Sequence, residues 1–198
     1  MREVPRVQTP VSVKDAAEHL VTALRAIGDQ PHRTQAELLL AQLWLETGRG
    51  VHCDNNNVGN ITAGPAWTGD AFRPAWFTVD EHSSPRLREL HDAMAKGKAP
   101  SLFRSYATLD AGFADYCRQL ATRFPSILRA ARAGDAHAVS AAIRASGYNP
   151  DNPIDATAAS LRSLANEFAR GGVFAALPLA PPAATPPQSP PSSSSPCS

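Results

Sequence analysis

The chain has 198 residues, 43% of them hydrophobic, which is enough apolar material for one domain with a core and hardly for two. The formal net charge is +1, with 19 Lys and Arg scattered among 18 acidic residues, and this argues against nucleic-acid binding. Cys53, Cys117 and Cys197 show no CxxC or zinc-finger spacing. We therefore predict no metal centre and no disulfide framework, and favour two buried reduced thiols over a Cys53–Cys117 bridge.

The N-terminal residues contain no continuous apolar segment of the kind found in secretion signals. No later segment supplies the roughly 18 apolar residues that a membrane-spanning helix needs. We therefore expect a protein without a membrane span, made in the cytoplasm without a standard signal peptide. Residues 1–10 are predicted to be a flexible N-terminus.

Two helices are predicted before residue 50. Ser12 followed by Asp15 is typical of the start of the first helix. Thr34 with Glu37 forms a capping-box pattern at the start of the second, which ends at Gly48. Because this second helix has almost no polar face, we expect it to be buried on nearly all sides.

Glu46 lies in the last turn of this apolar helix, just before a turn rich in glycine and asparagine. Partial burial and the negative end of the helix dipole both disfavour the ionised carboxylate and raise its pKa. A carboxylic acid that stays protonated near neutral pH can donate a proton, for example to a glycosidic oxygen. The alternative is a glutamate that simply turns into solvent at a helix end.

The segment from residue 51 to residue 83 is rich in glycine, asparagine and tryptophan. It predicts loops, with short strand-like pieces at residues 58–62 and 75–79. Ser84 as N-cap and Pro85 at the first helical position predict a short helix up to Lys96.

Helical periodicity returns after residue 109. It predicts four further helices: one capped by Asp110, one over residues 125–133, one over residues 135–146, and one that follows Asp155 and ends at Gly171-Gly172. Residues 177–198 are dominated by proline and serine and predict a disordered tail. The fold class is therefore mainly α (α+β), one domain over residues 11–176 with a small β-hairpin or loop excursion.

Six motifs occur in a recognisable order. They are AQLWLETGRG, NNNVGNI, Trp67-x-Gly69, Thr78-Val79-Asp80-Glu81, FRSY with the DAGFADYCRQL helix, and GYNPDNP. Together they resemble the bacterial glucosaminidase family of peptidoglycan hydrolases, flagellar and autolysin-type enzymes with a lysozyme-like fold. Two features depart from the family pattern: the predicted helix after Ser84 replaces a hairpin turn, and NNNVGN replaces a turn that contains an aromatic residue.

The resemblance implies three catalytic residues. Glu46 corresponds to the general acid that protonates the leaving oxygen of a β-1,4 linkage. Asp80 corresponds to the acid of the hairpin, and strand alternation would point only one of Asp80 and Glu81 into the cleft. We favour Asp80, with Glu81 beside the substrate; an exposed acid at a strand end is the alternative for both. Tyr148 corresponds to a cleft tyrosine that would bind the acetamido group or stabilise developing charge, and a half-buried structural tyrosine is its alternative.

Further residues are candidates for substrate binding. The resemblance implies that the turn before the hairpin lies along the sugar, through Asn57, Gly59, Asn60 and Ile61; ordinary turn chemistry is the alternative. Trp67 and Trp76 are candidate stacking platforms, although packing is the safer interpretation for such large aromatic residues. The cluster His52-Cys53-Asp54 lacks the paired spacing of a metal site, so no metal and no cofactor is predicted.

The resemblance implies an endo-β-N-acetylglucosaminidase that cuts the glycan strand of peptidoglycan. Muramidase and lytic transglycosylase activities use the same acid and stay open. The alternative from another class is a non-catalytic glycan-binding or structural component of a phage particle or secretion apparatus. We expect a monomer that acts at the cell wall, in the periplasm or outside the cell, after release or delivery.

Overall fold

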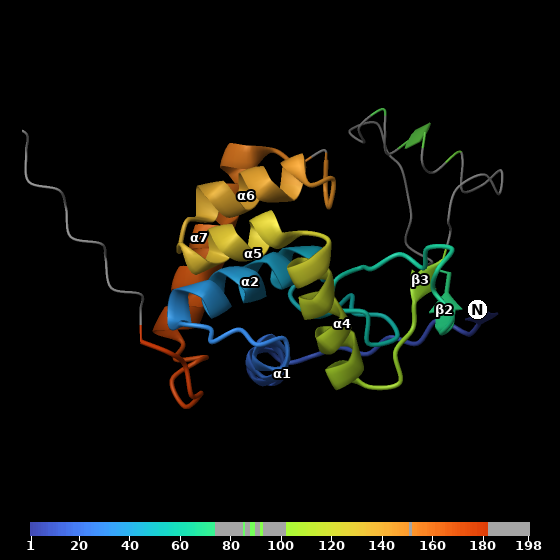
Figure 1. The fold of residues 1–198 in the computed structure, drawn as a ribbon, viewed down its shortest axis with the longest axis horizontal. Coiled ribbons are helices and arrows are strands. Elements are labelled where there is room, and N and C mark those ends of the chain that lie inside the picture. Colours follow the sequence, from blue (N-terminus) through green and yellow to red (C-terminus); the bar gives the residue numbers. More distant parts are fainter. Residues whose placement is uncertain (74–84, 86–87, 90–91, 93–101, 151, 182–198) are drawn as a thin grey trace, which may run out of the picture.

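The computed structural model describes residues 1–73, 85, 88–89, 92, 102–150 and 152–181. Within this part the fold is mainly α with a small sheet, as predicted (Figure 1). The helices are α1 (Val13–Ala26), α2 (Arg33–Glu46), α4 (Leu109–Thr122), α5 (Pro125–Arg132), α6 (Ala136–Ala145) and α7 (Ile154–Arg170). The strands are β1 (Arg2–Glu3), β2 (Asp70–Phe72) and β3 (Phe103–Arg104).

Helix α2 forms the centre of the helical part. It packs against α1, α5 and α7, while α6 packs on α5 and α7, and α4 packs on α1 and α5. Every residue from Gln35 to Trp44 is buried, which confirms the prediction from its nearly continuous apolar sequence. Trp44 lies in the core and contacts Phe168 of α7 edge to face.

The helix ends agree in part with the expected capping residues. The Ser12 side chain accepts from the Asp15 backbone N–H, as predicted, and Gly28 follows α1 with a φ of +81°. The N-caps of α2 and α4 are His32 and Thr108, so the expected capping box at Thr34 and the cap at Asp110 were wrong. In both cases an earlier side chain accepts a hydrogen bond from a backbone N–H of the first turn, and the helix therefore begins earlier.

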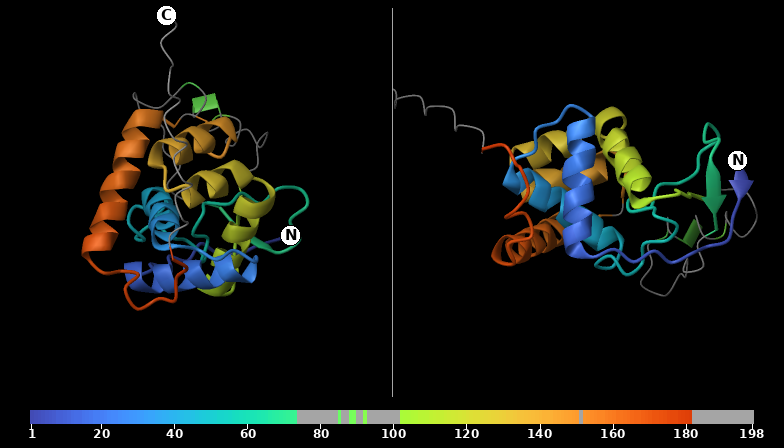
Figure 2. Two further views of the ribbon diagram at one scale, coloured as in Figure 1. Left: turned by 60° about the vertical axis from the view of Figure 1, so that its left-hand side comes forward. Right: turned by 90° about the horizontal axis from the view of Figure 1, so that it is seen from below.

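The sheet forms from segments that are far apart in the sequence. Its strand order is β1-β2-β3, with β1 parallel to β2 and β2 antiparallel to β3. Of the predicted strand at residues 58–62, the structure has only an isolated bridge from Thr62 to Phe103. The predicted strand at 75–79 and most of the predicted helix after Ser84 lie outside the described residues. In Figures 1 and 2 the sheet and the N-terminus lie to one side of the helices.

The N-terminal residues run along the loop that follows α2. The Thr9 N–H donates to the Cys53 carbonyl and the Asn55 N–H donates to the Val7 carbonyl, at 2.8 and 2.7 Å. Arg2 forms an ion pair with Asp70 on β2. The segment expected to be a flexible N-terminus is therefore hydrogen-bonded to the domain, because backbone groups of the loop supply its partners.

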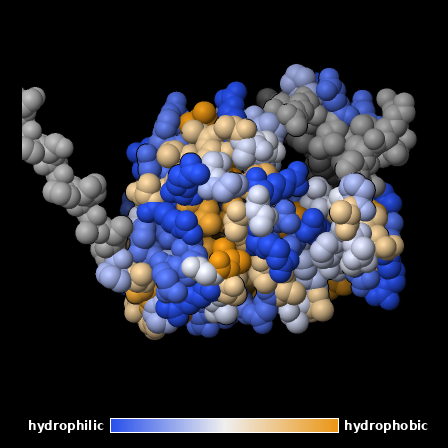
Figure 3. All heavy atoms as spheres, viewed as in Figure 1, coloured by the Kyte–Doolittle hydropathy of each residue, from blue (hydrophilic) through white to orange (hydrophobic). Residues whose placement is uncertain are grey.

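The folded chain also extends past residue 176. Leu177 and Leu179 pack against the core, and the Ala180 N–H donates to the Pro31 carbonyl at 3.0 Å. Cys53 and Cys117 are free and buried, which confirms the favoured interpretation of these cysteines. Among the described helices, none combines the length and the apolar character needed to cross a membrane. On the face shown in Figure 3, hydrophilic side chains surround smaller apolar areas over α1 and α2.

Candidate active site

A cleft of about 440 Å³ lies at the C-terminal end of α2. Segments from five parts of the chain meet there: the end of α2, the turn at residues 59–62, strand β3, the end of α4 with the start of α5, and the residues after α6. The lining residues are Glu46, Gly59, Asn60, Ile61, Thr62, Phe103, Gln119, Arg123, Phe124, Gly147, Tyr148 and Asn149. The sequence predictions had named five of them, Glu46, Gly59, Asn60, Ile61 and Tyr148, from three separate motifs.

Glu46 is the last residue of α2 and is partly exposed at this cleft. Burial raises the pKa of its carboxyl, and the side chains of Asn60 and Gln42 act in the opposite direction. The direction agrees with the expectation from the sequence, with desolvation as the main cause. Glu46 therefore keeps its proton to a higher pH than an ordinary glutamate.

A second hollow of about 390 Å³ adjoins the cleft. Glu46 and Asn149 line both. Its remaining walls come from α2, α6 and the start of α7, with Gln42 and Thr157 among the polar groups. Glu46 therefore lies where the two hollows meet.

Asn60 attaches the turn to the end of the helix. Its Nδ2 donates to the backbone carbonyl of Glu46 at 2.8 Å, one of the carbonyls that a helix end leaves without an intrahelical partner. Its φ of +48° is in the left-handed region, which asparagine tolerates better than most residues. The amide of Asn60 thus attaches the turn that lines the cleft to the backbone of Glu46.

Tyr148 contacts the same turn from the opposite wall. Its hydroxyl donates to the Gly59 carbonyl at 2.8 Å, and its ring packs edge to face on Phe124. Burial, and secondly the charge of Glu46, raise the pKa of this phenol. A Cβ on Gly59 would lie 2.8 Å from the Tyr116 ring and 3.4 Å from the Tyr148 hydroxyl. A glycine at this position therefore allows both tyrosines to pack under the turn.

Two of the sequence candidates lie away from the cleft. The buried amide of Asn57 donates to the carbonyls of Ile61 and Arg104 and accepts from the Ile61 N–H, so it shapes the turn from inside. Trp67 packs edge to face on Tyr106, with the Arg104 guanidinium 4.6 Å from its ring centroid. Neither residue is among those that line the cleft.

The other candidates fall in a part of the chain that is not described. Asp80, Glu81 and Trp76 lie outside the described residues. Within the described ranges, no group of three or more His, Cys, Asp or Glu side chains is placed to hold a metal ion.

Comparisons with known proteins connect this geometry to a family. No protein-family model matches the chain. The chain is 33% identical over 115 residues to the peptidoglycan hydrolase FlgJ of Vibrio cholerae, a match that covers 54% of this chain and 31% of that protein. The chain thus spans about a third of the length of this relative. The resemblance to the bacterial glucosaminidase family of peptidoglycan hydrolases is confirmed.

Solved structures agree on the lysozyme-like fold. The peptidoglycan hydrolase of Sphingomonas sp. A1 matches with a TM-score of 0.52 and 26% identity, over 83% of this chain and 92% of that one. The glycoside hydrolase domain of Salmonella typhimurium FlgJ matches with a TM-score of 0.51 and 20% identity, over 82% and 91%. The glucosaminidase-like fold therefore extends over most of the chain.

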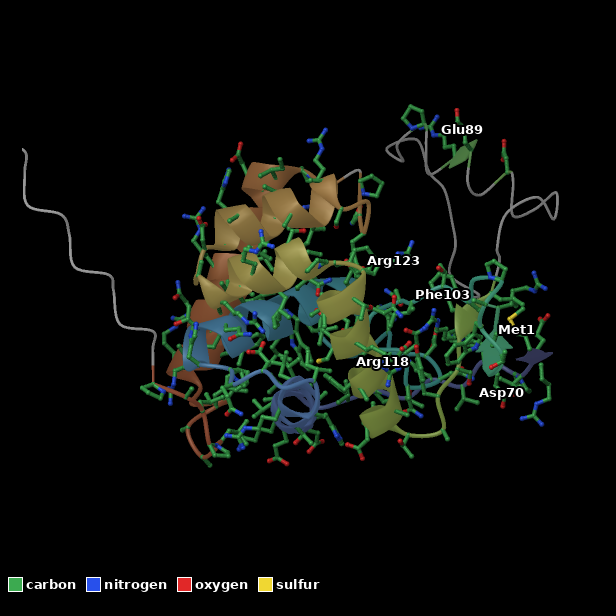
Figure 4. The ribbon with its side chains drawn as sticks, in the orientation of Figure 1. Met1, Asp70, Glu89, Phe103, Arg118 and Arg123 are labelled. Atoms are coloured by element: carbon green, nitrogen blue, oxygen red, sulfur yellow. The ribbon has the colours of Figure 1, made fainter. Side chains whose placement is uncertain are left out.

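The cleft contains residues that were not predicted from the sequence. Gln42 is the one polar residue in the apolar run from Leu38 to Leu45 and lies one helical turn before Glu46; this spacing was a usable signal. Arg123 caps the end of α4 with its guanidinium 5.1 Å from the Phe124 ring centroid. It extends toward the side where Phe103 lies (Figure 4). Phe103 begins the FRSY motif but was not singled out as a cleft residue. Arg123 had no sequence signal, because only the folded chain brings it to the cleft.

Proposed function

We propose that the protein hydrolyses the glycan strand of peptidoglycan as an endo-β-N-acetylglucosaminidase, with Glu46 as the general acid. The observation that carries this proposal is the position of Glu46 in the cleft, where burial raises its pKa. The names of the FlgJ of Vibrio cholerae and the Sphingomonas protein, both peptidoglycan hydrolases, support the substrate class.

The first chemical step is proton transfer from Glu46 to the glycosidic oxygen. As the bond between the anomeric carbon and this oxygen breaks, the leaving sugar keeps the electron pair and the proton, and positive charge develops on the remaining sugar ring. Glu46 becomes a carboxylate at that moment. The side chains of Gln42 and Asn60 favour the ionised form, so the group is suited to lose its proton as well as to hold it.

Tyr148 is suited to bind the substrate as a neutral phenol. Its hydroxyl donates to the Gly59 carbonyl. An ordinary tyrosine is protonated at neutral pH, and burial raises the pKa of Tyr148 further. The phenol oxygen can accept a hydrogen bond from the N–H of an acetamido group. We propose that Tyr148 binds this group while Gly59, Asn60 and Ile61 contact the sugar from the facing wall.

The second catalytic group is proposed from the sequence motif alone. Asp80, beside Glu81, would position a water molecule or stabilise the developing charge. If neither acid is needed, the acetamido group of the substrate would act instead, as in other substrate-assisted glycosidases. Asp80→Asn and Glu81→Gln, assayed side by side, distinguish these mechanisms. A large loss of activity in one variant identifies the second catalytic group. Unchanged activity in both variants indicates substrate assistance or transglycosylation.

Product analysis tests the proposed reaction. Purified protein is incubated with peptidoglycan, and the new chain ends are identified by mass spectrometry. We expect reducing N-acetylglucosamine ends; reducing N-acetylmuramic acid ends would identify a muramidase, and anhydro ends a transglycosylase. Binding to the wall without any released sugar would reject an enzyme in favour of a glycan-binding protein.

Glu46→Gln tests the role of the acid. The substitution is close to isosteric, so folding and binding to the wall should persist while kcat falls by about 10²–10⁴-fold. Glu37→Gln is the matched control, because Glu37 is a buried glutamate on the same helix about 14 Å along the axis from Glu46. Equal activity in Glu46→Gln and Glu37→Gln would remove Glu46 from its proposed role.

A further inference from the structure

Gln42 is a buried polar residue beside the proposed acid. It is 1% exposed and lies four residues before Glu46 on α2, so the two side chains project from the same face of the helix. Both side chains line the second hollow. The sequence surrounds Gln42 with leucine and tryptophan, an environment in which an amide is costly unless its polar atoms find partners.

The Tyr116 hydroxyl holds the Gln42 amide in one orientation. It projects from α4, is fully buried, and donates to Gln42 Oε1. Since the amide oxygen is held on this side, Nε2 is directed to the opposite edge of the planar amide group. In the described part of the chain, Nε2 is buried without a hydrogen-bond partner. A buried donor in this condition calls for an explanation.

We propose that Gln42 is a positioning residue for Glu46: the Tyr116 hydroxyl orients the amide so that Nε2 faces the carboxyl and donates to it as the proton leaves. This inference rests on the proposed function of Glu46 as general acid. During the step the proton passes to the glycosidic oxygen, the carboxyl becomes negative, and the Gln42 N–H stabilises that charge. A hydrogen bond to an ionised acceptor is stronger than one to a neutral acceptor, so this contact favours the transition state over the ground state.

The electrostatics around Glu46 support this role. The Gln42 side chain lowers the pKa of Glu46 against the larger effect of burial, and it acts in the same direction on the Tyr148 phenol. The other groups that face Glu46 are the Tyr116 and Tyr148 phenols, whose pKa values are raised, and Arg123 in the shared cleft. The wall from α7 contributes only Ala156, Thr157 and Ser160. Among the described residues, Gln42 and Asn60 are thus the amides that favour the ionised form of Glu46.

Gln42→Leu tests the proposal, because it removes both amide atoms and retains a similar volume. We expect kcat to fall by about 10- to 100-fold, the range for a misplaced catalytic group. We also expect the alkaline limb of the kcat–pH profile to move to higher pH, since the carboxylate loses a donor. Tyr116→Phe frees the amide to rotate and should move the limb in the same direction by a smaller amount.

Gln35→Leu is the matched control. Gln35 is also 1% exposed on α2, and its amide donates to Asp29, about 16 Å along the helix axis from Glu46. It should lose stability without any displacement of the pH profile. A Gln42→Leu enzyme whose kcat falls while the limb stays in place would show a merely structural role and overturn the proposal. An unchanged kcat, or a limb displaced to lower pH, would overturn it as well.

A direct titration separates this inference from the proposed function. The carboxyl carbon of Glu46 is followed by NMR in protein labelled with ¹³C-glutamate, with Glu46→Gln used for assignment. A higher Glu46 pKa in Gln42→Leu than in the wild type supports the contact even if the protein releases no sugar. An equal or lower pKa rejects it even if the enzyme is active. If Gln42→Leu does not fold, the pKa of Glu46 is measured in Tyr116→Phe instead.

Discussion

At the scale of single residues, the site depends on two opposing effects on the pKa of Glu46. A carboxyl at the end of a buried helix loses hydration, and this raises its pKa. The amides of Asn60 and Gln42 oppose the shift without cancelling it. A general acid needs such a balance, because it must hold its proton in the resting enzyme and release it during bond cleavage.

The raised pKa has a consequence for stability. The native state holds the Glu46 proton more tightly than the unfolded chain does, so stability falls as pH rises from the unfolded pKa through the folded pKa. Glu46→Gln cannot ionise and escapes this loss. We expect the variant to be more stable than the wild type at neutral pH, with a difference that shrinks toward acid pH.

Urea denaturation of both proteins between about pH 4 and pH 8 measures this difference. Glu37, whose pKa burial also raises, is present in both proteins and cancels from the comparison. If the wild type is as stable as Glu46→Gln across the whole pH range, burial of the ionised Glu46 carboxylate does not destabilise the native state.

At the scale of elements, Asp115 connects α4 to the strand that borders the cleft. Its buried carboxylate accepts from Arg104 Nη1 of β3 and from the Tyr106 hydroxyl, both at 2.6 Å, and also pairs with Arg118. Phe103, the neighbour of Arg104, lines the cleft. The ion pair therefore links the position of a cleft residue to the helix that carries Tyr116.

Asp115→Ala should destabilise the protein by about 3–5 kcal/mol, the cost of leaving a buried partner charge unpaired. Urea denaturation measures this loss, and a lower kcat/KM would show that the cleft wall depends on the pair. Asp155→Ala is the control, because Asp155 is 97% exposed in its contact with His137. Equal unfolding midpoints for the two variants would contradict a structural role for the buried pair.

At the scale of the whole molecule, both ends of the described chain are part of the domain. The N-terminal segment pairs with the loop that follows α2, and Arg6 lies 3.6 Å from the carboxylate of Asp54. At the other end, Leu177 and Leu179 cover the core near α1, and the Arg25 side chain donates to the Pro178 carbonyl. The folded unit is therefore longer at both ends than residues 11–176.

Truncation tests this boundary. A chain that ends at Ala176 loses the partly buried Leu177 and Leu179, so its free energy of unfolding should fall by roughly 2 kcal/mol. A chain that ends at Pro181 should match the full chain, because the proline- and serine-rich remainder predicts no packed structure. Chemical denaturation of the three proteins makes the comparison, and equal stability of all three would place the boundary at residue 176.

Local patterns predicted the helices well and the sheet poorly. Helix periodicity spans three to four residues, so the sequence around α1, α5 and α6 contains the information that defines them. The strands have two or three residues each and pair residues 2–3 with 70–71 and residues 71–72 with 103–104. Strand pairing between residues so far apart in the chain produces no periodic pattern in a short stretch of sequence. Two of the helix caps were also missed, Thr108 of α4 and His32 of α2, and His32 is an uncommon N-cap residue.

The sequence by itself determined the apolar helix, the acid at its end, and the turn and tyrosine motifs that accompany that acid. These are properties of residue type and short spacing. Only the tertiary structure decided which of the candidates share a cleft, because Asn57 and Trp67 turn toward internal partners while Gly59, Asn60 and Tyr148 line it. It also decided that the Tyr116 hydroxyl, which projects from another helix, holds the amide of Gln42. A contact between helices depends on packing across the core, and no local pattern records it.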